Sequence, residues 1–152
     1  MTGSPADAPP RSARASAIHD GPLPRSLANA ATLCTPAHGA IATFLGVVRS
    51  RRRERGVTRL VYQCHRPMAE RLLARFIDEA AERFDRALSA LVVHGTGVMR
   101  PGDVALCIHV SCTHRASAFD ACRHLSARIT QDLPVWTHEH YDDGTSCWCP
   151  PS

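Results

Sequence analysis

The sequence predicts an α+β fold in which two main amphipathic helices accompany a mainly antiparallel sheet. Segments rich in β-branched residues occur in pairs along the chain, and single segments with helical periodicity alternate with these pairs. The chain has 152 residues, 44% of them hydrophobic, which is enough for one well-filled core but not for two domains. We therefore expect a single domain over residues 16–152, preceded at residues 1–15 by a disordered leader rich in Pro, Ala, Ser and Arg.

The domain is expected to begin with two short elements. Residues 15–19 predict an edge strand, and residues 24–34 predict a short helix that a proline opens in its first turn. Longer strands follow at residues 40–48 and 57–65, because both segments are rich in β-branched side chains. The arginine-rich segment between these two strands ends at Gly56, and this pattern predicts a hairpin loop.

The clearest helix is predicted over residues 68–84. Its apolar side chains recur at intervals of three and four, while charged side chains occupy the opposite face. The apolar positions are Met68, Leu72, Leu73, Phe76, Ile77, Ala80 and Phe84. This pattern is typical of a helix with one buried face.

A second pair of strands is predicted at residues 91–94 and 104–112. The segment between them predicts a turn, because it contains residue types that favour turns: Gly97, Pro101, Gly102 and Asp103.

A second amphipathic helix follows this pair of strands. Its apolar positions are Ala118, Phe119, Cys122, Leu125 and Ile129. The helix ends before Pro134, because a residue that precedes proline avoids the α region. Residues 135–141 predict the last strand, and Asp143-Gly144 predicts a turn before Trp148.

All eighteen basic residues are arginine, and the chain contains no lysine. Arginine stays charged and suits the binding of phosphate or carboxylate, whereas lysine is the side chain that burial can convert into a base or nucleophile. The one arginine run (Arg51, Arg52, Arg53 and Arg55) lies in the predicted hairpin loop, where we expect solvated side chains. The few aromatic residues do not interleave with it, so we expect no nucleic-acid binding.

The cysteine content indicates a reducing compartment. The seven cysteines are an odd number, they are spread over strand-like and helix-like segments, and no apolar signal region follows Met1. We therefore expect reduced thiols and a cytoplasmic protein. No apolar stretch approaches the roughly 20 residues that cross a bilayer, so we expect no membrane association.

Basic side chains stand at the ends of several predicted elements. Arg49 leaves a strand, His114 and Arg115 lie between a strand and the second helix, and Arg100 lies in a turn. Together they predict an anion pocket, to which the free N–H groups at the helix N-terminus would contribute. The alternative is that each arginine pairs with an acidic side chain at the surface.

The C-terminal segment holds two histidine and two cysteine side chains at alternate positions. Strand alternation places His138 and His140 on one face, and it likewise places Cys147 and Cys149 on one face. These four could form a metal site, but their spacing differs from the usual zinc pattern. We favour ordinary reduced thiols on a polar strand, and we predict no metal and no bound cofactor.

Cys112 raises a separate question, because it precedes His114 by two residues and would share its face if the strand continued. This arrangement could support thiol-based sulfur transfer. The alternative, which we favour, is that Cys112 is a small buried hydrophobic residue.

Five parts of the chain together resemble the large, catalytic subunit of molybdopterin synthase. They are GAIATFLGVVRS at residues 39–50, the helix that starts near Met68, RPGD at residues 100–103, SCTHRASAFDACR at residues 111–123 and LPVWTHE at residues 133–139. The resemblance runs from about residue 16 to Trp148, and the five parts have the order and separation found in that family.

The resemblance implies an α/β hammerhead-type fold and a homodimer of large subunits within a heterotetramer. A ubiquitin-like small subunit would carry sulfur as a C-terminal thiocarboxylate, and the large subunit would transfer that sulfur to a cyclic pterin monophosphate during molybdenum cofactor biosynthesis. By the same resemblance, Phe44 and Arg49 would belong to the pocket wall, and His114 and Arg115 would bind the pterin phosphate or the carrier tail.

The chain departs from the family at two catalytic lysines, whose positions are occupied by Thr130 and Thr137. A threonine hydroxyl has no amine to act as an acid, a base or a nucleophile near neutral pH. His138, next to Thr137, could take over if it faces the pocket. Two hypotheses follow: a sulfur-transfer enzyme with slow or altered chemistry, or an inactive family member that still binds the sulfur carrier.

Overall fold

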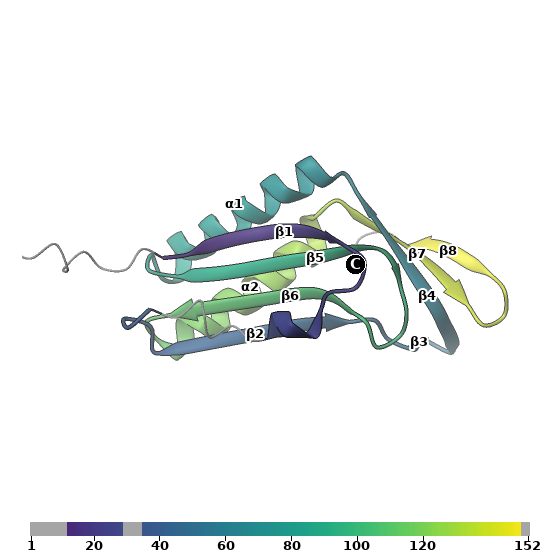
Figure 1. Ribbon diagram of the computed structural model, residues 1–152, viewed down its shortest axis with the longest axis horizontal. Helices are drawn as coiled ribbons and strands as arrows, with labels where there is room; N and C mark the ends of the chain where they lie inside the picture. Colours follow the sequence, from purple (N-terminus) through teal and green to yellow (C-terminus); the bar gives the residue numbers. More distant parts are fainter. Residues whose placement is uncertain (1–11, 29–34, 150–152) are drawn as a thin grey trace, which may run out of the picture.

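The computed structural model describes residues 12–28 and 35–149. Residues 1–11 of the expected leader and residues 29–34 of the predicted helix lie outside this description. The described elements, in chain order, are β1 (Arg14–Asp20), the 3₁₀ helix η1 (Arg25–Ala28), β2 (Ala40–Val47), β3 (Arg51–Arg52), β4 (Arg55–Cys64), α1 (Arg66–Phe84), β5 (Ser89–Met99), β6 (Val104–Cys112), α2 (Arg115–Asp132), β7 (Val135–Tyr141) and β8 (Ser146–Cys149) (Figure 1).

The strands form one sheet in the order β2-β6-β5-β4-β7-β8, with β1 added to β5 and β3 added to β4. Only the β1–β5 pairing is parallel among the described strands. Strand β5 joins the two halves of the sheet, because its first residues pair with β1 and β6 while Gly97 to Met99 pair with β4. The predicted α+β class with a mainly antiparallel sheet is confirmed.

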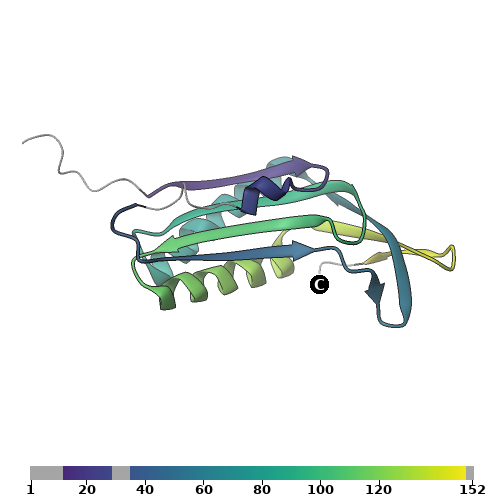
Figure 2. The ribbon, with the colours of Figure 1, turned by 60° about the horizontal axis from the view of Figure 1, so that its bottom comes forward.

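The two helices lie side by side and cover one face of the sheet (Figure 2). The core between helices and sheet contains fully buried side chains from α1, from α2 and from the central strands, among them Phe76, Leu125 and Ile108. Helix α1 begins at Arg66, two residues before the predicted start, because Pro67 is well tolerated in a first turn. Met68, which was predicted on the buried face, is exposed.

Two local predictions were wrong. Strand β5 extends through Gly97 to Met99, so the turn before β6 is shorter than predicted. Gly97 is not part of that turn, and it has φ +83° at the point where the pairing partner of β5 changes from β6 to β4. Strands β2 and β4 are not neighbours, because β2 pairs with β6 and β4 pairs with β5 and β7. Among the described strands, the short strand β3 alone forms a hairpin with β4.

The N-terminal boundary also differs from the prediction. Strand β1 begins at Arg14, so residues 14 and 15 belong to the sheet and not to the expected leader. The described part of the predicted helix at residues 24–34 is the 3₁₀ helix η1. Among the described helices, neither α1 nor α2 is both long enough and apolar enough to span a bilayer.

Candidate functional site

Two adjoining cavities lie where the end of α2, the start of β7 and the exit of β2 meet. The first has a volume of about 200 Å³, and its wall includes Phe44, Thr130 and Thr137. The second has a volume of about 240 Å³, and its wall includes Arg49, Glu139 and Cys149. The residues that line both cavities are Val47, Tyr62 and Thr137.

The end of α2 brings Thr130 and Thr137 to the same cavity. Leu133 closes the helix by donating its N–H to the carbonyl of Ile129, and Pro134 then directs the chain into β7. Thr130 lies in the last turn of α2 and Thr137 is the third residue of β7, so a short link separates them. The two positions at which the sequence resemblance placed the family lysines therefore line one cavity.

The hydroxyl of Thr130 is already engaged. It donates a hydrogen bond of 2.9 Å to the carbonyl of Ser126, four residues earlier in the same helix. Thr137 is half-buried, and it pairs with Tyr62 on one side and with Cys149 on the other. Burial raises the pKa of Tyr62, so its phenol stays protonated near neutral pH.

Backbone hydrogen bonds fix the position of Val48, the residue between the end of β2 and Arg49. Val48 is buried, its N–H donates to the carbonyl of Asp103, and its carbonyl accepts from the N–H of Gly102. These bonds fasten the exit of β2 to the turn that contains Arg100. Arg49 and this turn are thus neighbours, as the predicted anion pocket requires.

His114 and Arg115 lie at the opposite end of β2. The β2–β6 register pairs Ala40 with Cys112 at that end and Val47 with Val104 at the Arg49 end. Eight residues of strand separate the two ends by about 25 Å. The prediction that Arg49, His114 and Arg115 form one anion pocket is therefore wrong for a single chain, because β2 holds them apart.

His114 and Arg115 nevertheless occupy the predicted helix N-terminus. His114 is the N-cap residue of α2, and Arg115 is its first helical residue. They line a shallow, exposed depression together with Gly39, Thr113 and Ala116. Cys112, just before them, is fully buried, and its burial together with the nearby Asp85 raises its pKa to about 12, which fits the alternative of a small core residue.

His138 points away from both cavities. Its ring stacks on Trp148 at 4.5 Å between ring centres, and its Nε2 lies 3.1 Å from the hydroxyl of Ser146. Because side chains alternate along β7, His138 faces the side of the sheet opposite Thr137. His138 could take over from a lysine only if it faced the pocket, and this condition is not met. For the same reason, His138 and His140 do not meet Cys147 and Cys149 in one cluster.

Sequence reasoning missed Glu139 as a functional candidate. Glu139 is only 6% exposed, it forms an ion pair with Arg52, and its Oε2 accepts a hydrogen bond of 2.6 Å from the hydroxyl of Tyr141. The signal was available, since alternation places Glu139 two residues from Thr137 on the same face of β7.

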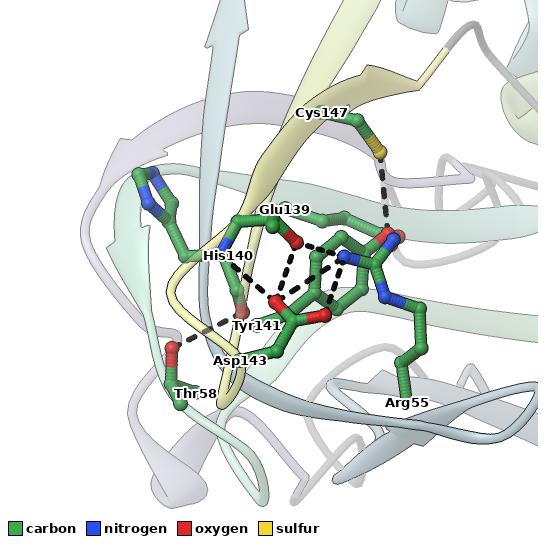
Figure 3. Close-up of polar contacts among 8 residues, drawn as sticks. Arg55, Thr58, Glu139, His140, Tyr141, Asp143 and Cys147 are labelled. Carbon is green, nitrogen blue, oxygen red and sulfur yellow. Dashed lines mark hydrogen bonds and ion pairs between the residues drawn. The ribbon is translucent and has the colours of Figure 1, made fainter.

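Tyr141 contacts the side chains of Glu139, Cys147 and Arg55. Cys147 Sγ lies 3.2 Å from its hydroxyl, and the Arg55 guanidinium lies 3.6 Å from its ring centre (Figure 3). Arg55 also forms an ion pair with Asp143. Two arginines of the run that was predicted to be a solvated loop, Arg52 and Arg55, thus dock the β3–β4 hairpin onto β7 and the turn that follows it.

Comparison with known proteins identifies the family. The model of the MoaE protein family matches residues 21–131. The molybdopterin synthase catalytic subunit of Synechococcus elongatus is 37% identical over 130 residues, which cover 85% of this chain and 78% of that protein. The chain belongs to the MoaE protein family.

Other MoaE-type relatives agree with this assignment. The molybdopterin synthase catalytic subunit of Bacillus subtilis is 39% identical over 106 residues, or 70% of this chain and 67% of that protein. The crystal structure of molybdopterin synthase from Staphylococcus aureus superposes with a TM-score of 0.81 at 29% identity, over 88% of this chain and 96% of that one. The region matched by the MoaE model includes Phe44, Arg49, Thr130 and the His114–Arg115 pair, and it ends before Thr137.

Proposed function

We propose that this MoaE-family protein is the large subunit of a cytoplasmic molybdopterin synthase. It would bind a ubiquitin-like small subunit, accept the C-terminal thiocarboxylate of that carrier and transfer its sulfur to a cyclic pterin monophosphate. The observation that carries the proposal is the convergence of Phe44, Arg49, Thr130 and Thr137 on two joined cavities in a chain whose relatives are molybdopterin synthase catalytic subunits.

The side chains that line these cavities have different roles in binding. Arg49 offers a guanidinium to an anionic group, either the pterin phosphate or the carrier's thiocarboxylate. Val47 supplies apolar surface at the junction of the two cavities, and Phe44 supplies it in the first cavity. Thr137 can donate a hydrogen bond to a developing negative charge, but it supplies neither the positive charge nor the proton that a lysine offers.

Because Arg49 and the His114–Arg115 pair lie at opposite ends of β2 in one chain, they can form one anion site only between two copies of the chain. A homodimer is therefore part of this proposal. Strand β2 lies at the end of the sheet, and its exposed apolar side chains include Ile41, Leu45 and Val47. A second copy related by a two-fold axis near the middle of β2 would run its own β2 in the opposite direction. His114 and Arg115 of each copy would then approach Arg49 of the other copy and complete the anion site.

Mixed dimers test whether the site is shared. We would combine Arg49→Ala chains with Arg115→Ala chains and follow product formation, in whichever background, native or lysine-restored, forms product. A shared site predicts that mixing restores activity, because one of the two sites in a mixed dimer has both arginines. No recovery on mixing, with chain exchange verified by mass spectrometry, would contradict the shared site.

A second candidate function is an inactive family member that still binds the carrier. The specific observation in its favour is the hydrogen bond from Thr130 to Ser126, because it occupies one of the two hydroxyl groups that replace the family lysines. In this case the cavities would receive the carrier tail without turning over the pterin.

Reconstitution distinguishes the two candidates. The purified protein, a thiocarboxylated small subunit and cyclic pterin monophosphate are combined and followed for dithiolene formation, with a Thr130→Lys/Thr137→Lys variant in parallel. Thr58→Lys is the matched control, since Thr58 is exposed and lines neither cavity.

Each outcome has a clear meaning. Product from the native chain supports the enzyme, and product from the double variant alone supports the inactive family member. If neither chain forms product and neither binds the thiocarboxylated carrier, the proposed function is wrong. Product from Thr58→Lys but not from the native chain would show that a lysine outside the cavities is enough for product formation, so the effect would not be specific to positions 130 and 137.

A further inference from the structure

The β7–β8 hairpin gathers two thiols and one carboxylate on a single face. Glu139 pairs directly with Cys147 across the ladder, and Thr137 pairs with Cys149. The ligand atoms of Glu139, Cys147 and Cys149 all lie within 4.8 Å of one another. Within the described residues this cluster is distinct from the His138–His140 pair, which lies on the other face.

The spacing of the two sulfur atoms suits a tetrahedral metal ion. Cys147 Sγ and Cys149 Sγ are 3.5 Å apart. Two Zn–S bonds of about 2.3 Å at a tetrahedral angle place their sulfurs about 3.8 Å apart, so a shift of a few tenths of an ångström would admit the ion. Thiolate and carboxylate are also ligand types that zinc-like ions accept.

We propose that Glu139, Cys147 and Cys149 form a binding site for one thiophilic divalent cation of the zinc class. Three protein ligands leave one coordination position for solvent or an anion. Glu139 and Cys149 also line the cavity that contains Arg49, so the ion would lie at the wall of that cavity. Binding would replace the two thiol protons, which would leave to solvent.

The contacts of Glu139 with Arg52 and Tyr141 would hold its carboxylate in one orientation for binding a metal ion. One of its oxygens pairs with Arg52 and the other accepts the Tyr141 hydrogen bond, yet each carboxylate oxygen keeps a second lone pair that can reach a metal. Such outer contacts commonly fix the geometry of ligating carboxylates. Glu139 and Cys149 are both buried, so the cluster is not one of the exposed acidic groups that occur on many surfaces.

A cation at this position would have a consequence for the neighbouring site. Cys149 stands directly across the ladder from Thr137, the position at which the family resemblance expects lysine. The two thiolates formed on binding would cancel the charge of the ion, but its open coordination position would give this cavity a Lewis acid, which threonine does not supply. This consequence rests on the proposed function, whereas metal binding itself does not.

Spectroscopic titration of the full-length protein tests the site. The reduced, chelator-treated protein is titrated with Cd²⁺, whose bonds to thiolate absorb in the ultraviolet, and then with Zn²⁺ in competition. We expect one ion per chain, release of protons, and a higher melting temperature with Zn²⁺. Cys147→Ser, Cys149→Ser and Glu139→Gln should each weaken binding by at least about tenfold, while Cys64→Ser, which changes a thiol outside the cluster, should bind as the native chain does.

Several results would overturn the proposal. One is binding of Cd²⁺ by a Cys147→Ser/Cys149→Ser variant with native affinity and stoichiometry, provided that circular dichroism shows the variant to be folded. Another is the absence of any thiolate absorption in the native protein. A third is mass-spectrometric loss of two hydrogens at Cys147 and Cys149 with no ion bound under reducing conditions, which would identify an easily oxidised dithiol instead. None of these readouts depends on sulfur transfer, so failure here leaves the proposed function untouched.

Discussion

Removing a single oxygen atom from Tyr141 should destabilise the protein measurably. In the variant Tyr141→Phe the ring remains, and so does its contact with the Arg55 guanidinium. The change deletes the 2.6 Å hydrogen bond that the hydroxyl donates to Glu139 and the 3.2 Å contact with Cys147. Glu139 is then left in the protein interior with Arg52 as its remaining partner among the contacts described above.

The expected magnitude follows from the charge and burial of the acceptor. Tyr141 and Glu139 are both only 6% exposed, and hydrogen bonds to charged groups contribute about 1.5–3 kcal/mol. We expect the free energy of unfolding to fall by about 2 kcal/mol and the melting temperature to fall by about 4–8 °C for a chain of this size.

Urea unfolding followed by circular dichroism measures the effect, with Tyr62→Phe as the matched control. Tyr62 is half-buried, its ring packs edge-on against His94 at 5.5 Å, and no described hydrogen bond joins its hydroxyl to a carboxylate. The control should therefore lose less than about 1 kcal/mol. If the two variants unfold at the same urea concentration with equal slopes, the reasoning about Glu139 is refuted.

Three further predictions concern the core, the pH dependence and the thiols. Leu125→Ala should lower the free energy of unfolding by about 2–5 kcal/mol in urea titrations, because Leu125 is fully buried, whereas Phe119→Ala on the exposed face of the same helix should change it by less than about 0.5 kcal/mol. Burial lowers the pKa of His94, so below about pH 6.5 the unfolded chain binds a proton that the folded chain does not bind. The free energy of unfolding should therefore decrease as the pH is lowered from 7 to 5, by up to about 1.4 kcal/mol per pH unit. The variant His94→Gln should show a weaker pH dependence. At pH 8 an alkylating reagent should modify the partly exposed Cys147 before the buried Cys112, whose pKa is raised to about 12, and peptide mass spectrometry would reveal any reversal of that order.

Local patterns in the sequence predicted most of the elements correctly. The periodicity of residues 68–84 and the position of Pro134 predicted both helices, and residues 135–141 were predicted as a strand with the observed boundaries. The turn at Asp143-Gly144 was also predicted, and Gly144 has the positive φ of 79° that such a turn uses. These features depend on interactions between residues close together in the chain.

Pairings between distant segments could not be predicted in the same way. Gly97 was interpreted as a turn residue because glycine favours turns, but in the folded chain it allows β5 to change partners. The two strands on either side of the arginine run were interpreted as a hairpin, yet each found a partner from a later part of the chain. Sheet neighbours are selected by burial over the whole core, which a local pattern does not contain.

By itself, the sequence determined the fold class, the family resemblance and the replacement of two expected lysines by Thr130 and Thr137. Those properties are carried by residue types and their spacing. Only the tertiary structure decided that both threonines line one cavity, that β2 holds His114 and Arg115 about 25 Å from Arg49, and that Glu139 joins Cys147 and Cys149. The physical reason is that strand register and the packing of helix ends determine which distant side chains share a face.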